Sequence, residues 1–252
     1  MSLASHDVVV DVESLSVHLR REHHRVRSIR EYAARRLRAR RMVEVESHSV
    51  LTRVSFRVRR GELFGVVGAN GAGKTTLLRV LAGIVPPSEG SVAVDGTIAP
   101  LIELGGGFDP ELTGVENVRL FGSLLGMPSA RLRAELPGIV RFAGLDDAID
   151  VAVKTYSAGM IARLAFAVAT AVEPEVLLVD EVLAVGDEEF RSRCVERIGG
   201  LRARGTSVVL VSHDLDLVER QADAAVYLDR GCIAACGAPR DVVAAYRKSV
   251  AI

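Results

Sequence analysis

Hydrophobic residues gather in short continuous runs that alternate along the chain with longer amphipathic stretches. Four of these runs have the length of strands and cover residues 62–67, 176–180, 207–211 and 225–229. Strands buried on both faces read as continuous apolar runs, and helical stretches between them are typical of a parallel sheet. The pattern therefore predicts an α/β fold.

Two other patterns lie outside these runs. Residues 7–19 and 49–58 alternate polar and apolar side chains and are predicted to be strands of an antiparallel layer, and residues 90–104 favour a further hairpin. Residues 111 to about 172 are mostly helical in pattern. We therefore expect one domain, residues 1–252. Its mixed-sheet core lobe covers about 7–110 and 173–252, and its helical lobe about 111–172.

A glycine-rich segment follows the first apolar run. GANGAGKT, from Gly68 to Thr75, fits the phosphate-binding pattern G-x-x-x-x-G-K-[ST] (Walker A) and lies between a predicted strand and a predicted helix. In such a loop backbone N–H groups and the helix N-terminus surround a phosphate, Lys74 reaches the terminal phosphates, and the Thr75 hydroxyl ligates Mg²⁺. The predicted ATP-binding residues are Gly68, Ala69, Asn70, Gly71, Ala72, Gly73, Lys74, Thr75 and Thr76.

Polar residues stand at the carboxyl ends of two later apolar runs, where open α/β sheets bind their ligands. Asp180 and Glu181 end the run VLLVDE. Asp180 is the expected Mg²⁺ partner, and Glu181 is positioned as the base that polarises the attacking water. His213 follows the next run. A lone histidine is usually a surface or core residue, but this one faces the same crevice.

The segment YSAGM, from Tyr156 to Met160, opens an amphipathic helix with Ser157 at its start. Alone, this is most often only a helix cap. Together with the phosphate loop and the carboxylates, it resembles the signature loop, normally LSGGQ, of ABC transporter ATP-binding subunits. The resemblance implies a P-loop NTPase of the ABC ATPase type and identifies His213 as the switch histidine and Asp187 as the D-loop aspartate. It also implies that Ser157, Ala158, Gly159 and Met160 contact the nucleotide of a second copy in an ATP-bound homodimer.

The segment APLIELGGGFDPELTGVENVRLFGSLLG, residues 99–126, resembles the ATPases that power export of bacterial surface polysaccharides such as O-antigen, capsule, teichoic acid and galactan. This resemblance implies ATP hydrolysis coupled to transport of a lipid-linked glycan. It also implies an integral membrane permease partner and a peripheral position on the cytoplasmic face of the cell membrane. The ATPase of an importer or a drug-efflux system is the alternative, because the shared motifs fit it too.

The sequence departs from the ABC pattern in three places. Glu103 stands nearest to the usual glutamine that joins nucleotide and membrane subunit, where its carboxylate is a candidate Mg²⁺ ligand. The usual adenine-stacking aromatic is replaced by Val17, His18 and Leu19, so His18 stacks, Tyr32 substitutes, or adenine is held loosely. No carbohydrate-binding domain follows the nucleotide-binding domain within these 252 residues.

Composition agrees with a globular ATPase. The chain is 49% hydrophobic and contains three cysteines, which suits one well-packed domain in the reducing cytoplasm. Cys232 and Cys236 fall in a predicted hairpin and are interpreted as reduced packing residues, since two ligands are too few for a metal site. The longest apolar stretch is interrupted by Arg163, so no membrane span is expected.

Charge is unevenly distributed although the net charge is zero. A basic insertion, about residues 20–41, contains ten arginines against Glu22 and Glu31. One interpretation is a solvated helix, and the other is a helix that lies on an anionic membrane or on a partner's cytoplasmic face. Nucleic acid is not expected as a partner, because Tyr32 is the only aromatic residue in this stretch.

Overall fold

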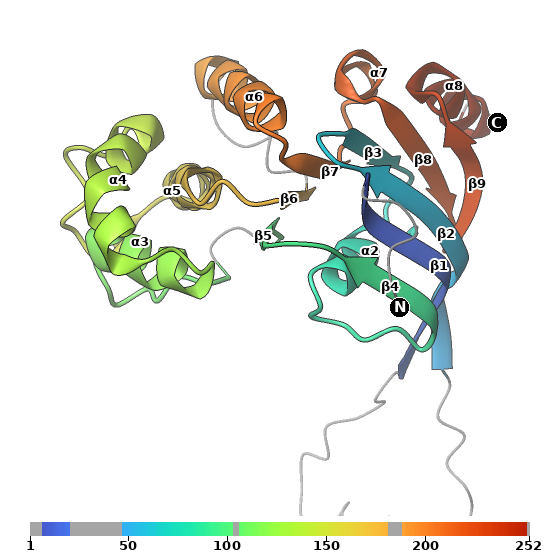
Figure 1. The fold of residues 1–252 in the computed structure, drawn as a ribbon, viewed down its shortest axis with the longest axis horizontal. Helices are drawn as coiled ribbons and strands as arrows, with labels where there is room; N and C mark the ends of the chain where they lie inside the picture. Colours follow the sequence, from blue (N-terminus) through green and yellow to red (C-terminus); the bar gives the residue numbers. More distant parts are fainter. Residues whose placement is uncertain (1–6, 21–46, 103–105, 181–187, 251–252) are drawn as a thin grey trace, which may run out of the picture.

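The computed structural model describes residues 7–20, 47–102, 106–180 and 188–250, and arranges their strands in two sheets (Figure 1). The smaller sheet is antiparallel and has the order β2-β1-β4, with bounds Ser47–Arg59, Val8–Arg20 and Glu89–Val94. The alternating sequence patterns predicted its first two strands. Val10, for example, pairs with Val58 on one side and with Val94 on the other.

The larger sheet has six strands in the order β5-β6-β7-β3-β8-β9. Its strands are β3 (Leu63–Val67), β5 (Ile98–Leu101), β6 (Val176–Asp180), β7 (Ser207–Val211), β8 (Ala224–Asp229) and β9 (Cys232–Gly237). The first five strands in this order are parallel, and β9 pairs antiparallel with β8. Every residue of β3 and β7 is buried, as their uninterrupted apolar runs predicted.

The hairpin expected in residues 90–104 is wrong. β4 joins the antiparallel sheet, whereas β5 crosses to the larger sheet and pairs parallel with β6. The turn at Gly96 has φ +96 and connects two sheets rather than two paired strands. A local turn signal states only where the chain bends, and Pro100 within β5 indicates an edge strand, where a missing N–H donor costs no ladder bond.

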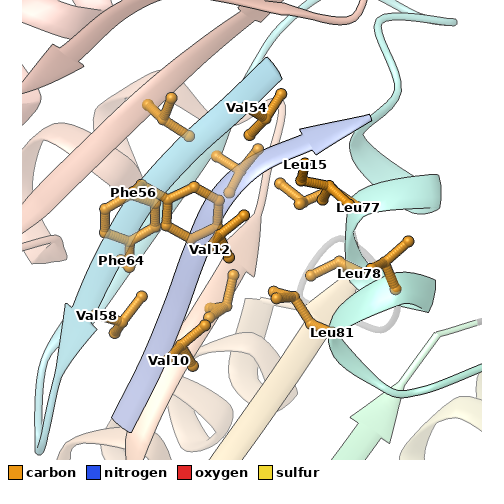
Figure 2. Close-up of a cluster of buried hydrophobic side chains, with 14 of the residues drawn as sticks. Val10, Val12, Leu15, Val54, Phe56, Val58, Phe64, Leu77, Leu78 and Leu81 are labelled. Atoms are coloured by element: carbon orange, nitrogen blue, oxygen red, sulfur yellow. The ribbon is translucent and has the colours of Figure 1, made fainter. Parts of the chain in front are cut away.

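Helix α2 (Lys74–Leu81) packs between the two sheets. Figure 2 shows Leu77, Leu78 and Leu81 facing the apolar side chains of β1 and β2. Within the same cluster the rings of Phe56 and Phe64 stack with centroids 4.8 Å apart. This core fixes the end of β3, and with it the start of the loop that follows.

The opposite face of the larger sheet carries α6 (Glu188–Ala203), α7 (Leu215–Gln221) and α8 (Pro239–Val250) (Figure 1). A separate group of helices lies beyond β5 and β6: α3 (Gly114–Leu124), α4 (Ser129–Ala143), the short 3₁₀ turn η1 (Val153–Thr155) and α5 (Ala158–Ala171). Their shared core contains Ile139, Leu164 and Val168. The predicted combination of a mixed-sheet core with helices grouped beside it is confirmed.

Candidate functional site

The loop between β3 and α2 is shaped by two glycines that lie against other backbone segments. A Cβ atom on Gly68 would lie 2.4 Å from the carbonyl oxygen of Leu228. A Cβ atom on Gly73 would lie 2.9 Å from the carbonyl oxygen of Val50. Neither position accepts a side chain without movement of the backbone, and residues 69–71 between them are exposed at the tip. Gly68 and Gly73 are therefore required by packing.

Lys74 is turned back over this loop. Its Nζ atom donates hydrogen bonds to the carbonyl oxygens of Gly68, at 2.8 Å, and Ala69, at 3.1 Å, and the residue is only 6% exposed. The N-cap of α2 is Gly73, which has no side chain to cap the helix start, and Thr75 and Thr76 are half-buried in the first turn. An ammonium group and uncapped N–H groups at one helix start form a site for an anion.

The turn of the predicted hairpin between β8 and β9 braces this loop, a contact that the sequence did not predict. The Gly231 N–H, between β8 and β9, donates to the carbonyl oxygen of Ala72 at 3.1 Å, and the Thr52 N–H donates to the carbonyl oxygen of Gly231 at 2.8 Å. Arg230 and Gly231 form a recognisable turn signal after an apolar run. That signal predicts the bend and carries no information on what the bend touches.

The carboxyl ends of three parallel strands lie next to one another beside the phosphate loop. Asp180, the last residue of β6, pairs with Val211 of β7, and Val211 in turn pairs with Val66 of β3. Neighbouring strands are about 4.8 Å apart, which places the Asp180 backbone about 10 Å from β3. Asp180 and the phosphate loop therefore share one edge of the sheet, as their positions after apolar runs predicted.

His213 lies at the same edge and is exposed. Both neighbours of this histidine are fixed: the Ser212 hydroxyl accepts from the Asp214 N–H at 3.0 Å, and the Asp214 carboxylate accepts from the Leu217 N–H at 2.9 Å and so caps α7. His213 also lines a cavity of about 390 Å³ between α6 and α7. Its backbone is held rigidly while its ring is accessible.

The signature segment begins α5 in the helical group. Ser157 is the N-cap, and its hydroxyl accepts from the Met160 N–H at 3.2 Å. Ser157 and Ala158 are exposed, whereas Tyr156 before them is buried and donates its hydroxyl to the carbonyl oxygen of Ala148 at 2.6 Å. Burial, and secondly Asp150, raises the pKa of Tyr156, so it remains a donor. An anchored tyrosine thus presents an open helix start to a ligand.

Gly159 also leaves space in front of this helix. A Cβ atom there would meet only the Ser157 hydroxyl oxygen, at 3.8 Å, so the backbone at the helix start is not covered by other parts of the described chain. The signature and the phosphate loop begin different helices, α5 and α2, which lie in different groups of the structure (Figure 1).

Several predicted site residues lie outside the described residues: Glu103, Glu181, Asp187, Tyr32 and most of the basic insertion. At the end of β1, Val17 is buried, so it does not offer a face to a base. His18 is exposed and its N–H donates to the Ser88 hydroxyl at 2.9 Å. Leu19 is 44% exposed beside it. His18 therefore remains the candidate for the base among the described residues.

The cysteines and acidic residues form no further candidate site. Cys232 and Cys236 are free and exposed on β9, and Cys194 is free and buried in α6. In the part of the chain that the structure describes, no three His, Cys, Asp or Glu side chains are grouped as a metal site requires. The described helices also include none that is both long and apolar enough to cross a membrane.

Sequence comparison finds the family that these features suggest. The family model described as "ABC transporter" matches residues 51–184, which include the phosphate loop, the signature and Asp180. The O-antigen export system ATP-binding protein RfbB of Klebsiella pneumoniae is 36% identical over 229 residues, covering 91% of this chain and 93% of that protein.

Other relatives are longer than this chain. The O-antigen export system ATP-binding protein RfbB of Myxococcus xanthus is 41% identical over 81% of this chain, which spans 47% of that protein. The teichoic acids export ATP-binding protein TagH of Bacillus cereus is 38% identical over 79% of this chain, which spans 36% of that protein.

Solved structures agree on the fold. An ATP-binding subunit of an ABC transporter superposes with a TM-score of 0.75 at 24% identity and covers 96% of this chain and 93% of its own. A dimeric ATP-binding cassette in a post-hydrolysis state, bound to ADP and Pi, superposes with a TM-score of 0.74 at 21% identity and covers 92% and 99%.

Proposed function

Because this chain belongs to the ABC transporter family, we propose that it is the ATP-hydrolysing subunit of an exporter that moves a lipid-linked polysaccharide across the cytoplasmic membrane. The observation that carries the proposal is the match to an O-antigen export ATP-binding protein over 91% of the chain. Three relatives named for O-antigen or teichoic acid export favour an exporter of this class over an importer or a drug-efflux system.

ATP is bound first by the phosphate loop. Lys74 already donates hydrogen bonds to two carbonyl oxygens of the loop. When ATP binds, a β- or γ-phosphate oxygen takes the place of these carbonyl oxygens as the acceptor. Hydrogen bonds from an ammonium to a charged acceptor are roughly twice as strong as those to a neutral one. The exchange therefore favours the bound nucleotide. Residues 68–76 supply the remaining contacts through their backbone N–H groups and the two threonine hydroxyls.

Mg²⁺ is the second ligand of the site. Thr75 and Asp180 are the proposed protein ligands, with Glu103 as a third candidate. A small number of protein ligands is sufficient for this ion. Mg²⁺ keeps several of its waters and is usually bound by one or two carboxylates together with substrate phosphates. When bound, the ion neutralises charge on the terminal phosphates. The half-buried Thr75 and the strand-end Asp180 lie at the same sheet edge, which is the donor set that such a site needs.

Hydrolysis requires a water aligned with the γ-phosphate. Glu181 is the proposed base that orients this water, directly after Asp180 on the chain. His213 is the proposed sensor of the γ-phosphate, and its anchored backbone and exposed ring suit that role. Asp187 is the proposed link between the two nucleotide sites.

A second copy of the chain completes each site. The open start of α5, at Ser157, Ala158, Gly159 and Met160, is the proposed partner surface for the nucleotide held by the other copy. An uncovered helix N-terminus favours an anion, and no other part of the described chain occupies it. We therefore propose a homodimer in the ATP-bound state beneath a permease, with the single domain held peripherally at the cytoplasmic face and with no nucleic-acid partner.

Deletion of the coding sequence in the source organism tests the function. The expected result is loss of a surface polysaccharide and accumulation of its lipid-linked form on the cytoplasmic side. Re-expression of wild type should restore export, whereas Glu181→Gln, produced at the same level, should not. A deletion strain with normal surface polysaccharide would exclude the proposed cargo, while hydrolysis of Mg-ATP by the purified chain would still identify an ATPase.

A further inference from the structure

Helix α6 connects the two parts of the proposed site. It begins at Glu188, which on the chain directly follows Asp187 and lies seven residues after Glu181. One face packs on the larger sheet through buried side chains. These are Phe190, Cys194, Ile198 and Leu201. The neighbouring face meets the helical group that carries the signature.

The contact with the helical group is made at the end of α4. The last carbonyl groups of a helix have no partner within the helix. Here the Arg193 guanidinium of α6 donates to the carbonyl oxygens of Phe142, at 2.8 Å, and Arg141, at 3.4 Å. Arg163 of α5 donates to the next carbonyl oxygen, that of Ala143, at 3.0 Å. Arginines from two helices thus cap a third helix, where positive charge is also favoured by the helix dipole.

Aromatic rings continue the same contact. The Phe142 ring of α4 lies 5.8 Å from the ring of Phe166 in α5 and 5.6 Å from that of Phe190 in α6. The guanidinium of Arg193 lies 4.9 Å from the Phe142 centroid, and that of Arg197 lies 4.6 Å from it. Arg193, Arg197, Phe142, Phe166 and Phe190 are called the arginine clasp below. The clasp joins α4, α5 and α6.

The clasp also brings two like charges close together. Arg193 and Arg197 are one helical turn apart, where like charges repel, and both are drawn over one ring. Burial, and secondly the charge of Arg204, lowers the pKa of Arg197. Local arrangements that oppose simple electrostatics are found preferentially at functional sites.

We propose that Arg193 is a positioning residue for ATP hydrolysis, which holds the start of α6 at a fixed place relative to the helices of the signature loop. On the chain, α6 directly follows the stretch that contains the proposed catalytic residues Glu181 and Asp187. This inference rests on the proposed ATPase function. The path is short: α5 begins at the signature, contains Phe166 and Arg163, and reaches α6 through Phe142. Movement of the signature helix is then transmitted to the start of α6 through the clasp.

Steady-state kinetics of the purified full-length chain test the proposal. Arg193→Gln should lower kcat for Mg-ATP about tenfold while KM stays within about twofold of wild type, because the phosphate loop is untouched. Arg193→Lys keeps the charge and one donor and should recover kcat to within about threefold. The matched control is Arg133→Gln, an exposed arginine on α4, which should leave both constants unchanged.

Several outcomes would overturn the positioning role. They are a wild-type kcat in Arg193→Gln, an equal loss in the Arg133→Gln control, no recovery with lysine, or a loss that matches the unfolded fraction measured by circular dichroism. Should Arg193→Gln fail to fold, Arg193→Lys and Phe142→Leu carry the test, since each keeps part of the clasp. Both should lower kcat about twofold to threefold at constant KM, and wild-type kcat in both refutes the role. A wild-type chain without any hydrolysis would instead refute the proposed function.

Discussion

Replacing Gly231 by alanine should both destabilise the protein and weaken its affinity for ATP, although this residue lies outside the phosphate loop. Gly231 has φ +80, and a Cβ atom there would lie 2.4 Å from the carbonyl oxygen of Val50. The same residue donates its N–H to the carbonyl oxygen of Ala72 inside the loop. A side chain here therefore pushes the turn away from β2 and strains the hydrogen bond between the turn and the phosphate loop.

The size of the effect has two parts. A left-handed conformation costs an alanine about 1–2 kcal/mol. Relief of the close contact requires one backbone to move by about 1 Å, and forced packing of this kind typically costs about 1–3 kcal/mol. The free energy of unfolding should fall by about 2–5 kcal/mol, and Tm by about 10 °C for a chain of this size. Because a displacement of about 1 Å in a binding site can cost as much as a hundredfold, KM for ATP should rise about tenfold.

Gly126→Ala is the matched control. Gly126 has φ +85, but no atom lies within 4 Å of the position its Cβ would take. The control therefore carries the conformational cost of about 1–2 kcal/mol without the collision, and it should keep the wild-type KM. Thermal unfolding by circular dichroism and ATP titration of hydrolysis measure the two effects. Equal losses of Tm in the two variants, with an unchanged KM in both, would refute the brace.

Four further results are expected. Lys74→Ala should lower phosphate release from Mg-ATP more than tenfold by removing a cation from the γ-phosphate, and retention of more than about a tenth of the rate would contradict its role. Glu181→Gln should bind ATP without hydrolysing it and elute as a dimer from a sizing column in ATP, whereas a persistent monomer would argue against the ATP-bound homodimer. Ser157→Arg should bind ATP without turnover. Mixed with Lys74→Ala it should regain partial activity, because a heterodimer has one site in which both the phosphate loop and the signature of the other copy are intact. No recovery in demonstrated heterodimers would count against a signature that acts on the other copy's nucleotide. Burial raises the pKa of Cys194 to about 12, so its thiol stays protonated at pH 8. A thiol reagent should therefore modify exposed Cys232 quickly but Cys194 only after unfolding. Rapid reaction of Cys194 in the native protein would show that it is not buried.

The strands of the larger sheet were predictable because burial on both faces leaves a strong local signal. β3, β6, β7 and β8 each read as an apolar run, and each lies within one residue of its expected bounds. The pairing of β5 was predicted wrongly because the local signal there does not identify its partner strand. Its four residues follow a turn signal that is consistent with a hairpin, and only its distant partner Val176 distinguishes the two outcomes.

Motifs whose chemistry is local were predicted, and contacts between distant segments were not. The phosphate loop and the signature each consist of neighbouring residues whose spacing is set by one anion, so the sequence contains the whole pattern. The Gly231 brace and the clasp between Arg193 and Phe142 join segments that are far apart on the chain. A lone glycine or arginine has many uses, and its partner is fixed only by the fold.

The burial of α5 explains how the clasp can transmit a movement. Most of this helix, from Leu164 to Ala171, is buried on all sides, so it is held as a rigid rod within the helical group. Its start, at Ser157, is the exposed part on which a second copy's nucleotide would act. A displacement of the helix start is not taken up by bending of the helix, because close-packed cores change by discrete shifts and transmit strain. The displacement of α5 therefore also moves the neighbours of Phe166, which include Phe142 and Phe190. Phe190 belongs to the first turn of α6, two residues after the helix begins, so the transmitted shift arrives next to the segment that contains Glu181 and Asp187.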